Sequence, residues 1–386
     1  MATVVTRSGS DGRPRYDVRY RDPGGVQRKR SFARRSDATA YAATVEADKL
    51  RGSYVDRNAG RELFKTYAEQ WLSSQIFAPN TRTVVTSRLK NHAYPVLGSK
   101  PLASIRPSTV QAWAKSLSRL APSTQHAVYG HVQAILTAAV DDQLIASNPC
   151  RAPSVTRPRN RSPKIAVWPR DRVPAMAASL PERYQVVIPI GAGLGLRQGE
   201  IFGLAVDDVD FLRREVTVRR QVSIDSSRLV FAPPKYGKIR TVPLAPAVAD
   251  AIAAHLARRP AIPVTLPWIE HDGPPVTAVL ICHTRERKAI NRNYFNSIWH
   301  AALRNVGVEP GRQNGCHALR HFFASVLLDA GESIKVVSEH LGHTDPGFTL
   351  RTYTHVMPDT RIRSVRAIDA VFSPDCAMDV PSGGSA

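Results

Sequence analysis

The sequence predicts a multidomain protein: a small β-sheet plus one helix at the N-terminus, an all-α second domain, and a mainly helical α+β third domain with a short antiparallel sheet. A chain of 386 residues is long enough for two or three domains that each bury a core. The prediction depends on how apolar residues repeat. They alternate near the N-terminus, follow helical spacing in the middle, and form short strand-like runs between helical segments in the last part.

The first domain, residues 1–58, is predicted to be a three-stranded sheet with one helix. Residues 16–21 alternate apolar and polar side chains, residues 22–25 favour a turn, and residues 27–32 form the returning strand. A helix follows over about 36–50. One face of the hairpin is expected to carry basic side chains, as a solvated surface or as one that enters the major groove of DNA: Arg19, Arg21, Arg28, Lys29 and Arg30.

The second domain, residues 62–149, is predicted to be helical. Apolar residues follow helical spacing over 63–72 and again over 128–139, and Asn148-Pro149 is expected to end the last helix. Residues 150–164 are rich in Pro and Arg and are predicted to form an extended basic linker. Its arginines can lie along phosphates: Arg157, Arg159 and Arg161.

The third domain, residues 165–372, is predicted to place strands at 215–220, 228–232 and 240–244 between helices. Lys235 follows the second strand and is expected at a hairpin tip. A segment with helical spacing after His355 either docks on a neighbouring protomer or packs on its own domain: Ile362, Val365, Ile368 and Val371. Residues 373–386 end in a Gly/Ser-rich run and are predicted to be a flexible tail.

The charge of the chain points to a polyanionic partner. Its 53 basic and 32 acidic residues give a formal charge of +21, and only 11 of the basic residues are lysines. Arginine matches phosphate oxygens with two hydrogen bonds, so nucleic acid is favoured, although charge alone also fits membranes and acidic proteins. The four cysteines are far apart, which argues against disulfides and structural zinc, and neither a signal peptide nor a membrane span is recognisable, so a cytoplasmic protein is expected.

Four short segments carry residues suited to phosphodiester chemistry without metal: 195–200, 317–321, 341–343 and 351–355. On a helix, His317, Arg320 and His321 fall within one arc, away from the apolar stripe. Arg197 and Glu200 can also share a helix face, where the carboxylate either orients the guanidinium or forms an ordinary surface ion pair. The glycines at 191, 193 and 195 only loosely resemble a nucleotide-binding loop, since no Walker lysine follows them.

These motifs resemble those of tyrosine recombinases, specifically phage or integrative-element integrases of the lambda-integrase type. The resemblance covers nearly the whole chain and implies a nucleophile, Tyr353, surrounded by a set of catalytic residues: Arg197, Lys235, His317, Arg320 and His343. Glu200 and His321 match supporting positions of the family. Lys238 lies close enough to Lys235 to be the alternative catalytic lysine.

The resemblance implies a site-specific recombinase that cleaves and rejoins DNA through a 3′-phosphotyrosyl intermediate, without ATP, metal or other cofactor. It implies that residues 1–58 bind arm-type sites, that residues 62–149 form a SAM-like core-binding domain, and that residues 165–372 are catalytic. The implied partners are double-stranded attachment sites, three further protomers in a homotetramer, a host DNA-bending protein and an excisionase, in the nucleoid of a bacterial cytoplasm. A type IB topoisomerase and a catalytically silent DNA-binding regulator are the alternatives.

Overall fold

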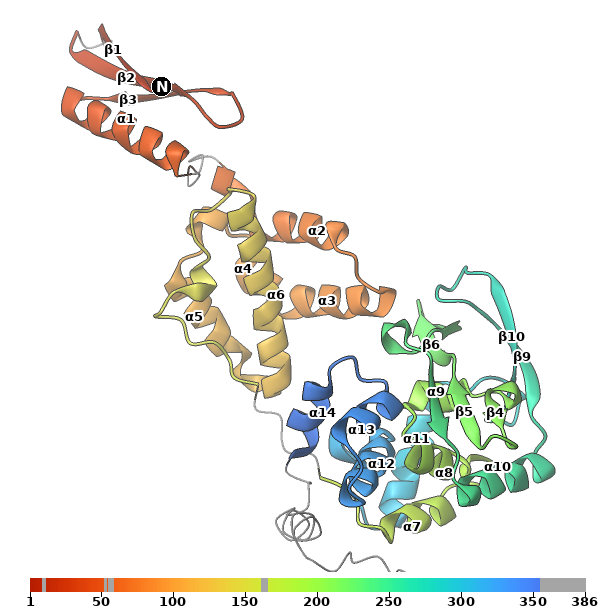
Figure 1. Cartoon of the computed structure of the whole chain (residues 1–386). Coiled ribbons are helices and arrows are strands. Elements are labelled where there is room, and N and C mark those ends of the chain that lie inside the picture. Colours follow the sequence, from red (N-terminus) through yellow and green to blue (C-terminus); the bar gives the residue numbers. More distant parts are fainter. Residues whose placement is uncertain (9–11, 52–53, 55–58, 161–165, 355–386) are drawn as a thin grey trace, which may run out of the picture. The chain divides into compact units, whose positions relative to one another are not determined.

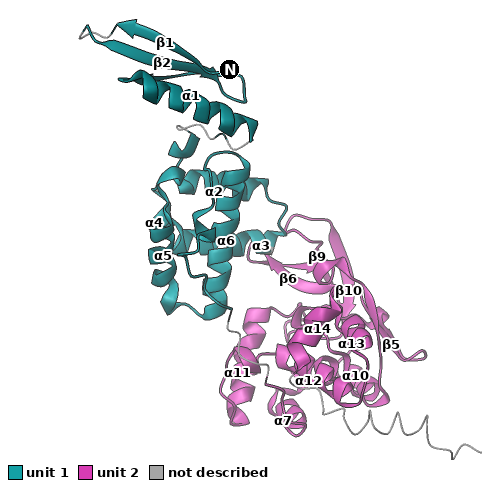
Figure 2. Cartoon of the chain, turned by 60° about the vertical axis from the view of Figure 1, so that its left-hand side comes forward, with its two compact units in different colours: residues 1–162 teal, residues 163–386 magenta. Residues whose placement is uncertain are grey.

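The computed structural model describes residues 1–8, 12–51, 54, 59–160 and 166–354. The chain divides into two compact units, residues 1–162 and 163–386 (Figure 2). Several sequence predictions fall outside the described residues: those for Arg161, His355, the segment over 362–371 and the tail at 373–386.

The N-terminal sheet is antiparallel, with strand order β1 (Thr3–Ser8), β2 (Pro14–Arg21) and β3 (Gln27–Phe32). Helix α1 (Arg35–Leu50) lies along one face of this sheet (Figure 1). Apolar side chains at alternate strand positions and at helical spacing form the small core between them: Val18, Tyr20, Ala38, Ala42 and Val45. This confirms the predicted arrangement of sheet and helix.

The basic side chains of this sheet lie on two faces, not one. Arg19 pairs with Lys29 across the strands, whereas Val18, which points at the helix, pairs with Arg30. The guanidinium of Arg30 accordingly lies 4.4 Å from the ring centroid of Tyr41 in α1. The prediction of a shared face is therefore wrong for Arg28 and Arg30, because successive side chains of a strand point to opposite sides.

The second domain is all-helical, as predicted, with α2 (Phe64–Ser74), α3 (Pro79–His92), α4 (Tyr94–Leu97), α5 (Pro107–Ser116) and α6 (Pro122–Asp141). Its core includes Trp113 stacked on Tyr129, with ring centroids 6.0 Å apart. Helix α6 ends at Asp141, earlier than predicted. Asn148 instead ties the following loop back onto α6, because its Nδ2 donates to the Gln133 carbonyl at 2.9 Å.

The second unit is mainly helical and surrounds its core with helices from both ends of its sequence (Figure 1). The elements before the strands are α7 (Arg172–Ser179), α8 (Val187–Leu194) and α9 (Gln198–Phe202), and α10 (Pro246–Arg258) lies among the strands. The elements after them are α11 (Arg292–Asn305), α12 (His317–Asp329), α13 (Ile334–Leu341) and α14 (Pro346–Tyr353).

Within the described part of the second unit, three small antiparallel sheets take the place of the single short sheet that the sequence suggested. They pair β4 (Val209–Asp210) with β5 (Glu215–Val218) and β8 (Arg240–Pro243), β6 (Gln221–Asp225) with β7 (Arg228–Ala232), and β9 (Ile262–Pro267) with β10 (Pro275–Leu280). The hairpin tip is Ser226-Ser227, where φ is 45° and 69°. Lys235 lies instead in the turn 235–237 that joins β7 to β8, so its predicted place at a tip is corrected.

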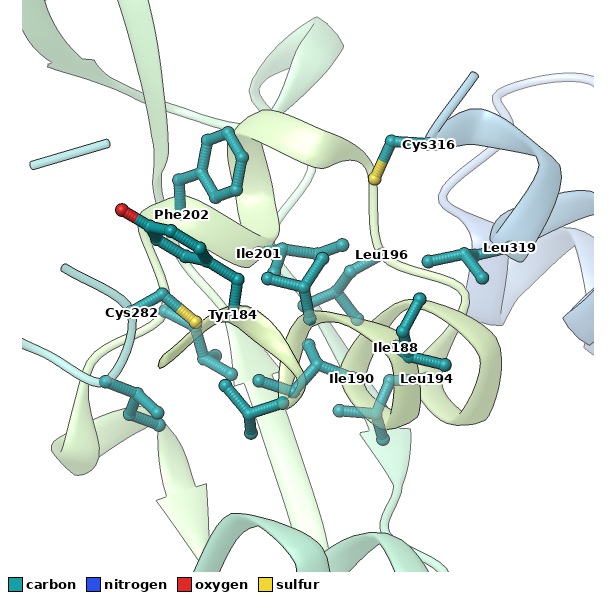
Figure 3. Close-up of a cluster of buried hydrophobic side chains, with 14 of the residues drawn as sticks. Tyr184, Ile188, Ile190, Leu194, Leu196, Ile201, Phe202, Cys282, Cys316 and Leu319 are labelled. Atoms are coloured by element: carbon teal, nitrogen blue, oxygen red, sulfur yellow. The ribbon is translucent and has the colours of Figure 1, made fainter. Parts of the chain in front are cut away.

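Close packing of α8 against α12 explains two of the glycines near residue 193. A Cβ atom at Gly191 would lie 2.6 Å from Cδ1 of Leu319, and one at Gly195 would overlap the ring of Phe323. Ile188, Leu194 and Leu319 belong to the core of this region (Figure 3). These glycines therefore serve helix packing, which fixes α12 and its first residues with respect to α9.

Candidate active site

Five of the six predicted catalytic residues line one cavity of about 390 Å³ in the second unit. They reach it from separate elements: Arg197 directly before α9, Lys235 in the β7–β8 turn, His317 and Arg320 in the first turn of α12, and His343 just after α13. The remaining lining residues are Tyr236, Thr344, Asp345, Phe348 and Arg351. The sixth predicted residue, Tyr353, is not among the lining residues.

Glu200 is fully buried beneath this cavity and holds Arg197 in place. Its carboxylate accepts the backbone N–H of Arg197 at 2.9 Å and Nη1 of the same residue at 2.9 Å. Burial raises the pKa of Glu200, but hydrogen bonds and charge from Arg240, with the charge of Arg197, outweigh it and hold the pKa at about 2. The pair is therefore not an ordinary surface ion pair, because the Glu200 carboxylate is buried and bonded to Arg197.

Arg240 is a site residue that the sequence did not predict. It lies in β8, and its guanidinium donates to both oxygens of Glu200, at 2.6 Å and 3.1 Å, while its Nε donates to the carbonyl of His340 at 2.7 Å. Strand alternation could have revealed it, because Arg240 and Val242 both point inward. An arginine at an inward position of a strand indicates a buried acidic partner.

Arg320 lies deep in the site rather than on the open face that helical spacing suggested. Its Nη1 donates to the carbonyl of Gly195 at 2.8 Å, and its Nη2 donates to the carbonyl of Leu341. Burial, then the charge of Arg197, lowers the pKa of Arg320 to about 9, so the group stays positively charged at neutral pH. Because these carbonyls fix the guanidinium and Arg320 also lines the cavity, it is prearranged for an anion.

The phenol of Tyr353 is buried and contacts His321. Its hydroxyl lies 2.7 Å from His321 Nδ1, and burial raises the pKa of Tyr353 to about 12. Burial and the charge of Arg320 lower the pKa of His321 to about 4, so this imidazole is neutral near pH 7 and can accept a proton. The structure thus brings His321, not His317, to the predicted nucleophile, although the two imidazole centroids are only 4.7 Å apart.

His317 and His343 face the cavity among positive charges. Desolvation and the neighbouring cationic groups lower the pKa of each imidazole to about 3. The His317 side chain is also exposed to solvent, and the ionisable groups that act on it are His321, Arg320, Arg197 and His343. Both imidazoles are therefore neutral in the free protein at neutral pH.

Lys235 is exposed at the edge of the cavity. Its Nζ lies 5.0 Å from the ring centroid of Tyr236, which is 68% exposed and has a φ of 66°. Lys238 is exposed in the same connection but does not line the cavity. The geometry therefore favours Lys235 over Lys238 as the lysine that can reach a bound phosphate.

The described candidate DNA contacts of the linker belong to the first unit. Arg157 and Arg159 are exposed, and Nη2 of Arg157 lies 3.3 Å from Nε2 of His126. Among the described residues, no group of three or more His, Cys, Asp or Glu could hold a metal ion, and Cys150, Cys282 and Cys316 are buried free thiols. No helix within the described ranges is long and apolar enough to cross a membrane.

Two family models match the chain. Residues 64–154 match the phage integrase central domain and residues 171–359 match the phage integrase family. The integrase of Mycobacterium phage FRAT1 is 27% identical over 288 residues, which cover 74% of this chain and 81% of that protein. Tyrosine recombinase XerC of Mycobacterium sp. strain KMS is 27% identical over 275 residues, covering 68% of this chain and 82% of the relative.

Solved structures share the fold. The Tn1549 transposon integrase in complex with a circular intermediate DNA superposes with a TM-score of 0.66 at 20% identity, covering 79% of this chain and 98% of that one. A lambda integrase tetramer bound to a Holliday junction gives a TM-score of 0.55 at 14% identity, covering 88% of this chain and 96% of the lambda integrase chain.

Fold and sequence similarity together define a tyrosine site-specific recombinase, an enzyme that breaks and rejoins DNA strands. Within that class, the chain belongs to the phage integrase family. The recognition made from the sequence motifs is confirmed, whereas the role of each site residue remains a prediction.

Proposed function

We propose that this recombinase integrates a phage or mobile element into a bacterial chromosome, and excises it, by cleaving and rejoining DNA attachment sites through Tyr353. The observation that carries the proposal is the convergence of Arg197, Arg320, His317 and His343 on one cavity, with the phenol of Tyr353 held at His321 beside it. The two guanidinium groups, buried for Arg320 and partly exposed for Arg197, are held in place by hydrogen bonds and suit the extra negative charge of a phosphorane.

The reaction consists of two transesterifications. Tyr353 Oη attacks the scissile phosphorus, the P–O5′ bond breaks, and a 3′-phosphotyrosyl bond and a free 5′-hydroxyl remain. His321 accepts the phenol proton, and Lys235 supplies the proton that the leaving 5′-oxygen takes. His317 assists as an acid or base at the phosphate. A 5′-hydroxyl from the partner duplex then reverses the step, so no ATP is consumed.

The proposed substrates are double-stranded attachment sites of core and arm type. The proposed domains are an arm-binding domain (1–58), a core-binding domain (62–149), a basic linker (150–164) and a catalytic domain (165–372). Solved relatives that share this fold hold DNA, and the lambda integrase one is a tetramer on a Holliday junction, which supports a tetrameric synapse for this chain. A host DNA-bending protein, an excisionase and a location at the bacterial nucleoid belong to the same proposal.

A nicked suicide substrate tests the nucleophile. The full-length protein should form a covalent adduct that survives denaturation, and Tyr353→Phe should bind the same DNA without forming one. An adduct in Tyr353→Phe would overturn the assignment. Replacing Arg197 or Arg320 should slow adduct formation on the order of 10²-fold or more, and a chelator should leave the rate unchanged, because no step needs a metal.

Two further experiments separate this function from its alternatives. A supercoiled plasmid with paired attachment sites should recombine, whereas a type IB topoisomerase would relax plasmids with or without the sites and a silent regulator would change neither. Deleting residues 1–58 should remove footprints at one class of sites and keep cleavage at the core sites. Unchanged footprints across the attachment region would contradict the arm-binding role.

A further inference from the structure

A buried carboxylate lies on the outer face of the N-terminal sheet, the face away from α1. Helix α1 covers the other face (Figure 1). Asp17 shares the outer face with Arg19, because the two residues are two positions apart on β2, whereas Val18 between them belongs to the core under the helix. Asp17 is nevertheless only 1% exposed, so side chains of the neighbouring strands must cover it.

Donors from both flanking strands meet at Asp17. Ser31 stands opposite Asp17 on β3, and its hydroxyl donates to Oδ1. Arg7 on β1 donates through Nε to Oδ2 at 3.0 Å, and Nζ of Lys29 lies 3.6 Å from the same oxygen. The hydrogen bond from Ser31, then the bond and charge of Arg7, lower the pKa of Asp17 against the effect of burial, so the carboxylate is ionised at neutral pH.

The position of this carboxylate needs a reason beyond charge. It stands among exposed basic side chains of the same face, which include Arg19, Arg21 and Lys29. A negative charge among them opposes the attraction of phosphates. Either Asp17 only separates like charges within the sheet, or it orients a donor for DNA, and these two roles predict opposite effects on binding.

The bond through Nε leaves the terminal nitrogens of Arg7 for another partner. Among the described residues, neither Nη1 nor Nη2 takes part in a hydrogen bond or ion pair, and the side chain is 48% exposed. The bond draws Arg7 from the edge strand toward the central strand, β2. Its planar fork, which matches N7 and O6 of guanine, therefore stands near the middle of the face, whereas Lys29 carries only a point charge.

The sheet has a width that suits the major groove. Neighbouring strands lie about 4.8 Å apart, so three strands span about 10 Å, and the groove is about 12 Å wide. Side chains near the middle of an inserted face meet the edges of the bases, which carry the sequence information. A guanidinium already held by a carboxylate loses less side-chain entropy when it binds there.

We infer that Arg7 reads a guanine in the major groove and that Asp17 is the positioning residue that orients its guanidinium. This inference rests on the proposed arm-binding role of residues 1–58 and names a base contact within that role. Because Asp17 fixes Nε, the fork of Arg7 stays directed at one place on the DNA, and a base without the two acceptors of guanine leaves its donors unpaired.

A pool of DNA duplexes with a randomised segment supplies the probe. Sequences that the full-length protein enriches, and that the variant lacking residues 1–58 does not, should share a guanine at one position. Replacing that base with 7-deazaguanine, which has no N7 acceptor, should weaken binding of the native protein about tenfold. It should leave the affinity of Arg7→Gln unchanged. An equal loss of affinity in the two proteins would overturn the inference.

Asp17→Asn separates orientation from charge. The substitution removes a negative charge, so a face that binds DNA through charge alone should hold selected and unrelated duplexes more tightly. If Asp17 orients Arg7, the ratio of the affinity for the selected duplex to that for an unrelated duplex should fall about tenfold. Asp22→Asn makes the same change of charge at the turn after β2 and should keep the native ratio. A native ratio in Asp17→Asn would contradict the orienting role.

Arg7→Lys guards against a variant of Asp17 that does not fold, because it keeps the charge and leaves Asp17 a cationic partner. It should bind unrelated DNA with the native salt dependence and lose the preference for the selected guanine. A preference retained in both Arg7→Lys and Arg7→Gln would overturn the inference and leave the arm-binding role intact. If no enriched sequence depends on residues 1–58, the arm-binding role and the inference fail together.

Discussion

Arg240 and Glu200 form a buried two-point ion pair, with Nη2 2.6 Å from Oε2 and Nη1 3.1 Å from Oε1. The same carboxylate accepts two hydrogen bonds from Arg197, so Arg240 positions the cavity-lining guanidinium through Glu200. Arg240 also donates to the carbonyl of His340, two residues before Gly342. One side chain on β8 thereby links α9 to the end of α13, the two elements next to which the predicted catalytic residues Arg197 and His343 lie.

Replacing Arg240 with Leu should destabilise the second unit by about 3–5 kcal/mol, because the Glu200 carboxylate stays buried with half of its partners removed. Urea unfolding, followed by tryptophan fluorescence, measures the change. Arg258→Leu is the matched control, since Arg258 is exposed and its pair with Glu182 spans 3.9 Å, and it should change stability by less than about 1 kcal/mol. Equal effects of the two substitutions would contradict the role of Arg240.

Because the pKa of Glu200 is lowered in the folded protein, the free energy of unfolding should depend on pH in the acidic range. The folded-state pKa of about 2 lies below the usual value of 4.5, so the stabilisation is fully present above about pH 4.5 and disappears as the pH falls through 2. Its size is on the order of 3 kcal/mol. Chemical unfolding at several pH values measures this dependence. Between pH 5 and 2, the free energy of unfolding should decrease less in Glu200→Gln than in the native protein. An equal decrease in the two proteins would contradict this assignment.

His321→Asn should lower single-turnover cleavage by about 10²-fold, because it removes the base that contacts the phenol of Tyr353. DNA affinity should be retained, since His321 is uncharged near neutral pH in the free protein. A quenched cleavage assay and a binding titration on the same substrate separate the two quantities. If His321→Asn cleaves at the native rate, another group must take the proton.

Lys235→Ala should slow cleavage on the order of 10²-fold, whereas Lys238→Ala should have little effect, because only Lys235 lines the cavity. A substrate with sulfur in place of the bridging 5′-oxygen needs no acid for its leaving group. It should restore the rate of Lys235→Ala. Rescue of Lys238→Ala instead would assign the general acid to Lys238.

Arg19→Gln and Arg21→Gln should weaken binding of DNA by the N-terminal sheet, because both side chains lie on the face away from α1. When one interaction with a phosphate is removed, the slope of the logarithm of the association constant against the logarithm of the salt concentration should become smaller in magnitude by about 0.9. Arg30→Gln is the matched control with the same change of charge. It should leave the slope unchanged and lower the stability of the sheet, since Arg30 stacks on Tyr41. A reduced slope in Arg30→Gln would place the binding face on the helix side.

Local patterns in the sequence were sufficient for most of the fold. Residue periodicity predicted the N-terminal sheet with α1 and the helical nature of the second domain, because the burial of one helix or sheet face leaves a direct trace in the sequence. It failed for part of the second unit: β4, β6, β9 and β10 were not expected, and β5 and β8 lie in a different sheet from β7. Pairing between distant strands is decided by contacts that no local pattern records.

The sequence by itself determined the family and the types of residue at the site, because Arg197, His317, Arg320, His343 and Tyr353 stand in short recognisable motifs. Only the tertiary structure revealed which side chains touch. Arg240 joins Glu200 from 40 positions away, Thr349 contacts His343 from another helix, and His321 rather than His317 meets the phenol. These partnerships arise when separate elements pack around one core, and burial then sets the protonation of each group.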